Sequence, residues 1–230
     1  MTRLIPILLL AFGMFVMIRM SSWHTGRTLR RRSRPLLNDQ IEALLSRLAR
    51  TAGIEHVQVR LLEMPVVNGL ATPSGEIYIT RGLFRKFQTG RISAAELASV
   101  VAHEMGHLAL GHTKRRIIDV TGAQTIHLVL GSILNRFIPI FGWIIARWIT
   151  AFAISHVTRK DEFEADAYAT ALMVKSGFGA EPQARMLEKL LELAPETAAQ
   201  ETSWLASHPP VSERVDAIRQ NAERWEATAG

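Results

Sequence analysis

The residues best suited to chemistry lie in one short run, His103-Glu104-Met105-Gly106-His107. Two histidines four positions apart lie on the same face of a helix, about one turn from each other, so both imidazoles can reach a single metal ion. Neutral imidazole nitrogens suit zinc, and a catalytic zinc keeps one coordination position open for water. Glu104 lies beside that position, where it would accept a proton as water attacks a peptide carbonyl. The spacing therefore predicts a hydrolytic zinc site.

The competing interpretation is a pair of ordinary helix histidines. The surrounding sequence is apolar, and unpartnered polar groups are costly in such a helix, which favours metal binding. The chain contains no cysteine, so His and carboxylate side chains must hold any metal. The apolar neighbours of the motif are Leu97, Val100, Val101, Leu108 and Leu110.

A third protein ligand must come from further along the chain. His112 is the nearest candidate, but on one continuous helix it lies about 140° further round than His107 and points away from the metal. Leu110 and Thr113 stand where the metzincin pattern requires Gly and His, which excludes that class.

Glu162 is the better candidate, because Glu162 and Asp166 again lie four residues apart on one helical face. One carboxylate can bind zinc while the other accepts the free N–H of a ligating histidine. Glu164 is expected to point elsewhere. Alone, this acidic run would be typical of a solvated helix start. Its position after the histidine motif favours the metal site.

Several elements must position these residues. A capping box, Ser93 to Glu96, predicts the start of a long buried helix that carries the histidines and continues to the basic cluster at 114–116. Asn38 or Asp39 caps an earlier helix over 40–52, and residues 33–38 read as a linker. Residues 56–62 and 76–80 are typical of strands, with 65–70 as an irregular edge, so a small antiparallel sheet is expected. Further helices are predicted over 160–175, 182–193 and 211–225.

The N-terminus carries a short apolar segment, residues 4–18, between Arg3 and Arg19. As a helix it spans about 23 Å against a hydrocarbon core of roughly 30 Å, so the flanking arginines must snorkel. A cleaved signal peptide is the alternative, yet no alanine occurs between Ala11 and Ala43 to form a typical cleavage site. The arginine-rich flank that follows favours an anchor, contact with anionic lipid headgroups and a cytoplasmic domain.

Charge argues against a nucleic-acid partner. The net charge of +6 arises at the N-terminus, where residues 1–34 hold seven arginines and no acidic residue. The remaining chain carries 20 basic and 21 acidic residues, and so lacks the basic excess that phosphate contacts require.

Three blocks, HEMGHLALGH, TRKDEFEADAYA and SHPPVSERVDAI, resemble the HtpX and CAAX prenyl protease family of zinc peptidases, in which they occur in this order. The resemblance runs from about Asn38 to Ala222. It implies that His103, His107 and Glu162 bind one zinc ion per chain, with Glu104 as the base. It also implies that Asp166 contacts a zinc histidine, that Arg214 belongs to the site, and that His208 is catalytic, steadying the oxyanion.

The same family often has a membrane hairpin between its two metal blocks, and the apolar residues 126–155 occupy that place. Three forms stay open: a spanning hairpin, an interfacial hairpin, or a hairpin buried in a soluble core. Contact with membrane lipids is favoured, since Trp143 and Trp148 suit an interface.

The sequence thus predicts an α+β, mainly helical, zincin-like domain at 38–226, preceded by a membrane anchor at 1–20 and a basic linker at 21–37. The expected function is zinc-dependent endopeptidase activity on protein or peptide substrates, in quality control of membrane or misfolded proteins. The enzyme would lie at the plasma membrane with its domain in the cytoplasm. A non-catalytic membrane adaptor and a soluble periplasmic peptidase are the alternatives.

Overall fold

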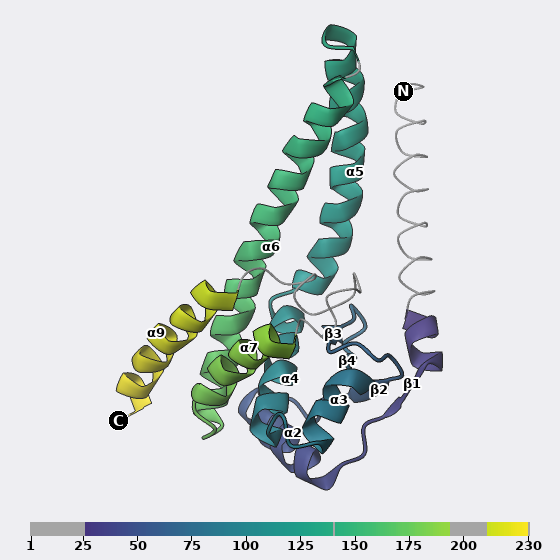
Figure 1. Cartoon of the computed structure of the whole chain (residues 1–230). Helices are drawn as coiled ribbons and strands as arrows, with labels where there is room; N and C mark the ends of the chain where they lie inside the picture. Colours follow the sequence, from purple (N-terminus) through teal and green to yellow (C-terminus); the bar gives the residue numbers. More distant parts are fainter. Residues whose placement is uncertain (1–25, 140, 194–210, 230) are drawn as a thin grey trace, which may run out of the picture.

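The computed structural model describes residues 26–139, 141–193 and 211–229 (Figure 1). The predicted anchor at 1–20, the first part of the basic linker and His208 lie outside the described residues. Within them the fold is mainly helical with one small sheet, which confirms the expected α+β character.

The sheet has four strands in the spatial order β1-β2-β4-β3. The expectation of a purely antiparallel sheet is wrong for one pair, because β2 and β4 run parallel. The chain places β3 at the outer edge and returns between β2 and β3, so β4 is antiparallel to β3 and parallel to β2. The strands are β1 (Ser33–Pro35), β2 (Val59–Leu62), β3 (Gly69–Ala71) and β4 (Ile77–Thr80).

Strand β1 forms where the sequence suggested only a linker. Its three residues pair antiparallel with β2, and Pro35 is acceptable there because an edge strand can spare an N–H. The guanidinium of Arg60 fastens the strand by donating to the hydroxyl of Ser33 at 2.9 Å and to its carbonyl at 3.1 Å. Three residues are too few for a periodic signal, which explains why the pattern gave no strand.

Helices α2 (Asp39–Thr51) and α3 (Arg81–Gln88) flank the sheet in sequence. Asn38 caps α2 as expected, with its side chain accepting the N–H of Ile41 at 3.1 Å. Helix α3 was not expected, and it begins where the Thr80 side chain accepts the N–H of Leu83. Both helices turn leucine or isoleucine side chains into the core.

Helix α4 (Ala94–Ala109) carries the histidine motif and begins at the predicted capping box. The N–H of Ser93 donates to Glu96 at 2.6 Å, and the N–H of Glu96 donates back to the Ser93 hydroxyl at 3.2 Å. Almost the whole helix is buried, since α2, the sheet and later helices surround it. Lys189 also donates to Glu96 at 2.8 Å, which ties a later helix to the start of α4.

Helices α5 (His112–Phe137) and α6 (Phe141–Lys175) form a long hairpin that projects from the body (Figure 1). The predicted hairpin at 126–155 is its outer part, and α6 runs on without a break into the predicted helix at 160–175. Gly131 permits close packing, because a Cβ there would lie 2.2 Å from the ring of Trp143. We call residues 127–139 and 141–151 the hairpin tip.

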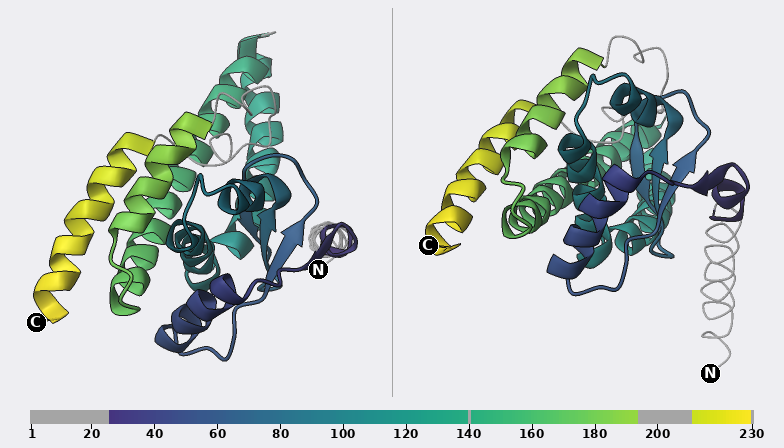
Figure 2. Two further views of the ribbon diagram at one scale, coloured as in Figure 1. Left: turned by 60° about the horizontal axis from the view of Figure 1, so that its bottom comes forward. Right: turned by 90° about the horizontal axis from the view of Figure 1, so that it is seen from below.

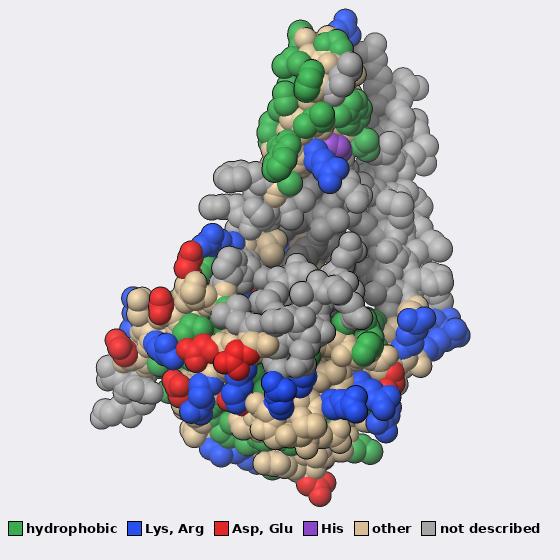
Figure 3. Space-filling model, in the orientation of Figure 1, with side chains coloured by type: hydrophobic (Ala, Val, Ile, Leu, Met, Phe, Trp, Pro, Cys, Tyr) green, Lys and Arg blue, Asp and Glu red, His purple; other side chains and the backbone are tan. Residues whose placement is uncertain are grey.

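The tip is rich in exposed apolar side chains, and Figure 3 shows that hydrophobic groups cover most of its described surface on that face. None of the described helices, however, combines the length and apolar character needed to cross a membrane. The exposed large hydrophobic residues of the tip are Leu128, Val129, Ile133, Phe137, Ile138, Phe141, Trp143, Ile144, Trp148 and Ile149.

Helices α7 (Glu181–Leu193) and α9 (Val211–Ala229) complete the body, close to the expected 182–193 and 211–225. Figure 2 shows α4 and α6 at the centre, with the sheet on one side and α7 and α9 on the other. The central pair is therefore shielded from water on both sides, and it is this pair that carries the candidate site.

Candidate metal centre

Helices α4 and α6 approach each other closely where the histidine motif faces the acidic run. The contact depends on Gly106, since a Cβ there would lie 2.9 Å from the carbonyl oxygen and 3.0 Å from the Cα of Ala165. The glycine between the two histidines and the alanine between the two acids thus allow the helices to meet.

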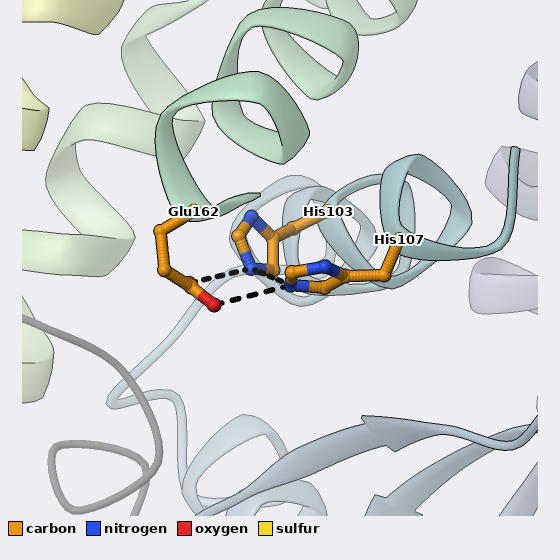
Figure 4. Close-up of side chains that lie close together, drawn as sticks. All are labelled: His103, His107 and Glu162. Atoms are coloured by element: carbon orange, nitrogen blue, oxygen red, sulfur yellow. Dashed lines mark hydrogen bonds and ion pairs between the residues drawn. The ribbon is translucent and has the colours of Figure 1, made fainter. Parts of the chain in front are cut away.

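This approach brings His103, His107 and Glu162 together (Figure 4). The two Nε2 atoms lie 3.1 Å apart, and the Glu162 carboxylate lies 3.3 Å from that of His103 and 3.4 Å from that of His107. All three side chains are buried, and one ligand atom from each lies within 4.8 Å of the others. This is the spacing of three donors that converge on one ion.

The far nitrogen of His103 is held by a buried ion pair. Its Nδ1 lies 2.9 Å from Asp166, and Arg214 donates to the same carboxylate at 2.6 and 2.9 Å. Gln183 adds a hydrogen bond to the Asp166 carbonyl at 3.2 Å. A further nitrogen of Arg214 lies 3.4 Å from Glu162, so one cation neutralises two acids of the site.

These contacts set the protonation of the group. Burial alone would raise the pKa of Asp166, but hydrogen bonds and charge from Arg214, together with His103, hold it below its ordinary value. Burial alone would lower the pKa of His103, but hydrogen bonds to Asp166 and Glu162 raise it to about 9. A charged Asp166 keeps the proton on Nδ1, which leaves Nε2 as the nitrogen that faces the centre.

Glu104 is buried beside the histidines on α4. Burial would lower the pKa of Arg214, yet its bonds to Asp166 and the nearby charges of Glu162 and Glu104 raise it. Glu104 therefore belongs to the same electrostatic cluster, although it is not one of the three converging donors.

The structure brings together every site residue expected from the sequence except His208, which lies outside the described residues. Sequence reasoning missed Gln183, since a single glutamine near a helix start carries no recognisable signal. It also set aside His112 and Glu164, whereas the structure places His112 against both His107 and Glu164, at 3.0 Å in each case.

The comparison with protein families agrees with this geometry. The pattern of Peptidase family M48 matches residues 35–222, most of the chain, and the protein belongs to this family. The resemblance drawn from the three sequence blocks is thereby confirmed.

Among known proteins, the chain is similar to the Metalloprotease LoiP of Escherichia coli, with 27% identity over 66% of this chain and 58% of that protein. It is similar to the Mitochondrial metalloendopeptidase OMA1 of Arabidopsis thaliana, with 26% identity over 75% of this chain and 33% of that protein. A Protease HtpX homolog of Leptothrix cholodnii is 24% identical over 91% of this chain and 82% of its own length. The chain thus spans less than two thirds of the first two relatives.

Proposed function

We propose that the protein is a zinc-dependent metalloendopeptidase whose metal is held by His103, His107 and Glu162. The observation that carries this proposal is the convergence of three buried donors between α4 and α6. Membership of a peptidase family supports it, as do relatives named as metalloproteases.

The donor set fits zinc in kind and number. Two imidazoles and one carboxylate are ligands that zinc accepts, and three protein ligands leave the fourth position open, as in catalytic rather than structural sites. Zinc held there would act as a Lewis acid and lower the pKa of water to about 7.

Glu104 is the proposed general base. It follows His103 directly on α4 and is buried within the same cluster, so its carboxylate is excluded from bulk water. There it would take the proton of the attacking water and pass it to the nitrogen of the leaving amine. A non-catalytic adaptor with the same fold would have no use for this base, which is why we favour an enzyme.

The edge strand β3 is the proposed platform for the substrate. It forms the outer edge of the sheet and lies against α4, the helix that carries His103 and His107. An extended peptide can pair with such an edge through main-chain hydrogen bonds, which would orient its carbonyl while tolerating many sequences. This platform suits membrane or misfolded proteins, the substrates we propose.

The substitution Glu104→Gln tests the mechanism. It keeps the size of the side chain but removes the base, so cleavage of an unfolded protein should fall by about 10² to 10⁴-fold while zinc content and melting temperature stay unchanged. A folded, zinc-loaded variant that cleaves at the parental rate would sink the mechanism and revive the adaptor.

We also propose that the hairpin tip contacts membrane lipid. Its apolar side chains are exposed, with Trp148 at 73%, and tryptophan favours the headgroup region. In vesicles with brominated acyl chains, tryptophan fluorescence should be quenched, and the variant Trp143→Phe/Trp148→Phe should lose the quenched component. Trp225→Phe, on α9, is the matched control and should retain it. Equal quenching in the parent and the double variant would contradict lipid contact.

The arginine-rich flank supports a plasma-membrane location with the peptidase domain on the cytoplasmic side. A C-terminal reporter that is active only after export should therefore stay silent. Strong reporter activity would instead favour the periplasmic peptidase.

A further inference from the structure

The outer nitrogen of His107 faces a second histidine. His107 Nδ1 lies 3.0 Å from His112 Nδ1, and the other ring nitrogen of His112 lies 3.0 Å from a carboxylate oxygen of Glu164. His112 is only 1% exposed, so no water competes for these contacts. Three side chains from α4, α5 and α6 thus form a continuous chain of hydrogen bonds.

The protons in this chain follow from its geometry. Two Nδ1 atoms at hydrogen-bond distance require one donor and one acceptor. If the Nε2 of His107 is a metal ligand, its proton is on Nδ1 and is donated to His112. The proton of His112 is then on Nε2, where it is donated to Glu164. Each ring has a single tautomer, and each contact has a donor and an acceptor.

We propose that His112, backed by Glu164, is a positioning residue for His107. This inference rests on the proposed zinc site. His112 does for His107 what Asp166 does for His103: it fixes the tautomer and the ring orientation that present Nε2 to the centre. Zinc-binding histidines nearly always have such a partner, and no other contact of His107 Nδ1 would serve as well as this buried one.

The local fold explains how His112 reaches His107. Helix α4 ends at Ala109, and Gly111 adopts a left-handed conformation with φ of 73° before α5 begins at His112. The chain reverses there, so His112 folds back onto the last turn of α4. The 140° argument from the sequence assumed one continuous helix, and the break at Gly111 removes that assumption.

Glu164 behaves as the charged end of this chain. Burial would raise its pKa, but the hydrogen bond to His112 and the charge of Lys160 hold it below its ordinary value. A charged carboxylate accepts a stronger hydrogen bond than a neutral group would.

A second metal ion is the rival interpretation, since His112, Asp161 and Glu164 also lie close enough to share one. Arg115, however, donates to Asp161 and already supplies a cation there. His112 lies 3.9 Å from Asp161 but 3.0 Å from Glu164, so it favours the hydrogen-bonded chain. We therefore assign these residues to positioning rather than to a second metal.

The test compares His112→Leu with His112→Asn in the full-length protein. Zinc affinity is measured by competition with a chromophoric chelator, and ligand geometry by the visible absorption of the cobalt-substituted protein. Leucine fills the space without an acceptor, so zinc affinity should fall by about 10 to 100-fold and the cobalt spectrum should change. Asparagine offers an oxygen close to the Nδ1 position, so affinity and spectrum should return most of the way to the parental ones.

Glu164→Gln keeps an acceptor without the charge, so it should weaken zinc binding by a few-fold and supports the test if the His112 variants fold poorly. Lys160→Gln removes the other ion-pair partner of Glu164 and is the matched control, expected to bind zinc like the parent. Parental affinity and an unchanged spectrum in His112→Leu would overturn the positioning role while the zinc site stands. Loss of a second zinc equivalent would favour the rival metal, and a parent without zinc would overturn the proposed function and this inference with it.

Discussion

The two histidines of the site have the same chemical type but very different surroundings. His103 is backed by Asp166 and Arg214, an ion pair sealed between α6 and α9. His107 is backed by His112 and then by Glu164, whose side chain is 39% exposed. One side of the centre is therefore locked into the core, and the other leads out to the surface.

This difference separates stability from metal binding. On the His103 side, the groups that orient the ligand also hold the core together, because Arg214 is a fully buried cation that depends on Asp166. On the His107 side, the last group is partly solvated, and water can replace it at small cost. Substitutions on the two sides should therefore affect folding unequally even where their effects on zinc are similar.

The largest effect is expected where the two sides meet, at Glu162. Glu162→Ala removes a proposed ligand rather than its support, so zinc affinity should fall by more than about 100-fold, beyond the loss of an outer partner. Metal analysis of the purified protein measures this. Glu188→Ala, an exposed carboxylate on α7, is the control and should keep its zinc. Tight binding by Glu162→Ala would show that the ligand assignment is wrong.

Asp166→Ala comes next and should break the buried side. Zinc affinity should fall about 10 to 100-fold, and unfolding free energy by about 3 to 5 kcal/mol because Arg214 is left buried without its main partner. Urea unfolding measures the second effect. Adding Arg214→Met should restore much of the stability but not the zinc affinity. If the double variant is no more stable than Asp166→Ala, the unpaired cation is not the cause.

Glu164→Ala should give the smallest effect and so sharpens the contrast. The side chain is partly exposed, so the loss in unfolding free energy should stay below about 1 kcal/mol, while zinc affinity falls by less than about 10-fold. The same unfolding and chelator assays apply. A loss of stability as large as that of Asp166→Ala would remove the distinction between the two sides.

The sequence predicted the inner side of the site well because its signals are local. His103 and His107 repeat at helical spacing, as do Glu162 and Asp166, and Ser93 with Glu96 marks the helix start. Each pattern lies within a single turn of a single helix, where spacing alone fixes which side chains share a face.

The outer side was missed because it depends on a break in the chain. His112 reaches His107 only through the reversal at Gly111, and the spacing of residues on a helix says nothing about the far side of such a turn. The parallel pairing of β2 with β4 was missed for a related reason, since it depends on where β3 inserts in space. Gln183 comes from a separate helix and has no motif at all.

The unbroken course of α6 also sets a length. From Phe141 at the tip to Glu162 at the centre the helix advances 21 residues, or about 31 Å at 1.5 Å per residue. With the tip in lipid, this rod fixes how far the centre can lie from the membrane surface. A substrate held in the same membrane with its tail along this rod would need about nine extended residues, at roughly 3.4 Å each, to reach the centre. The hairpin would thus act as a ruler that selects substrates by the length of their unfolded tails.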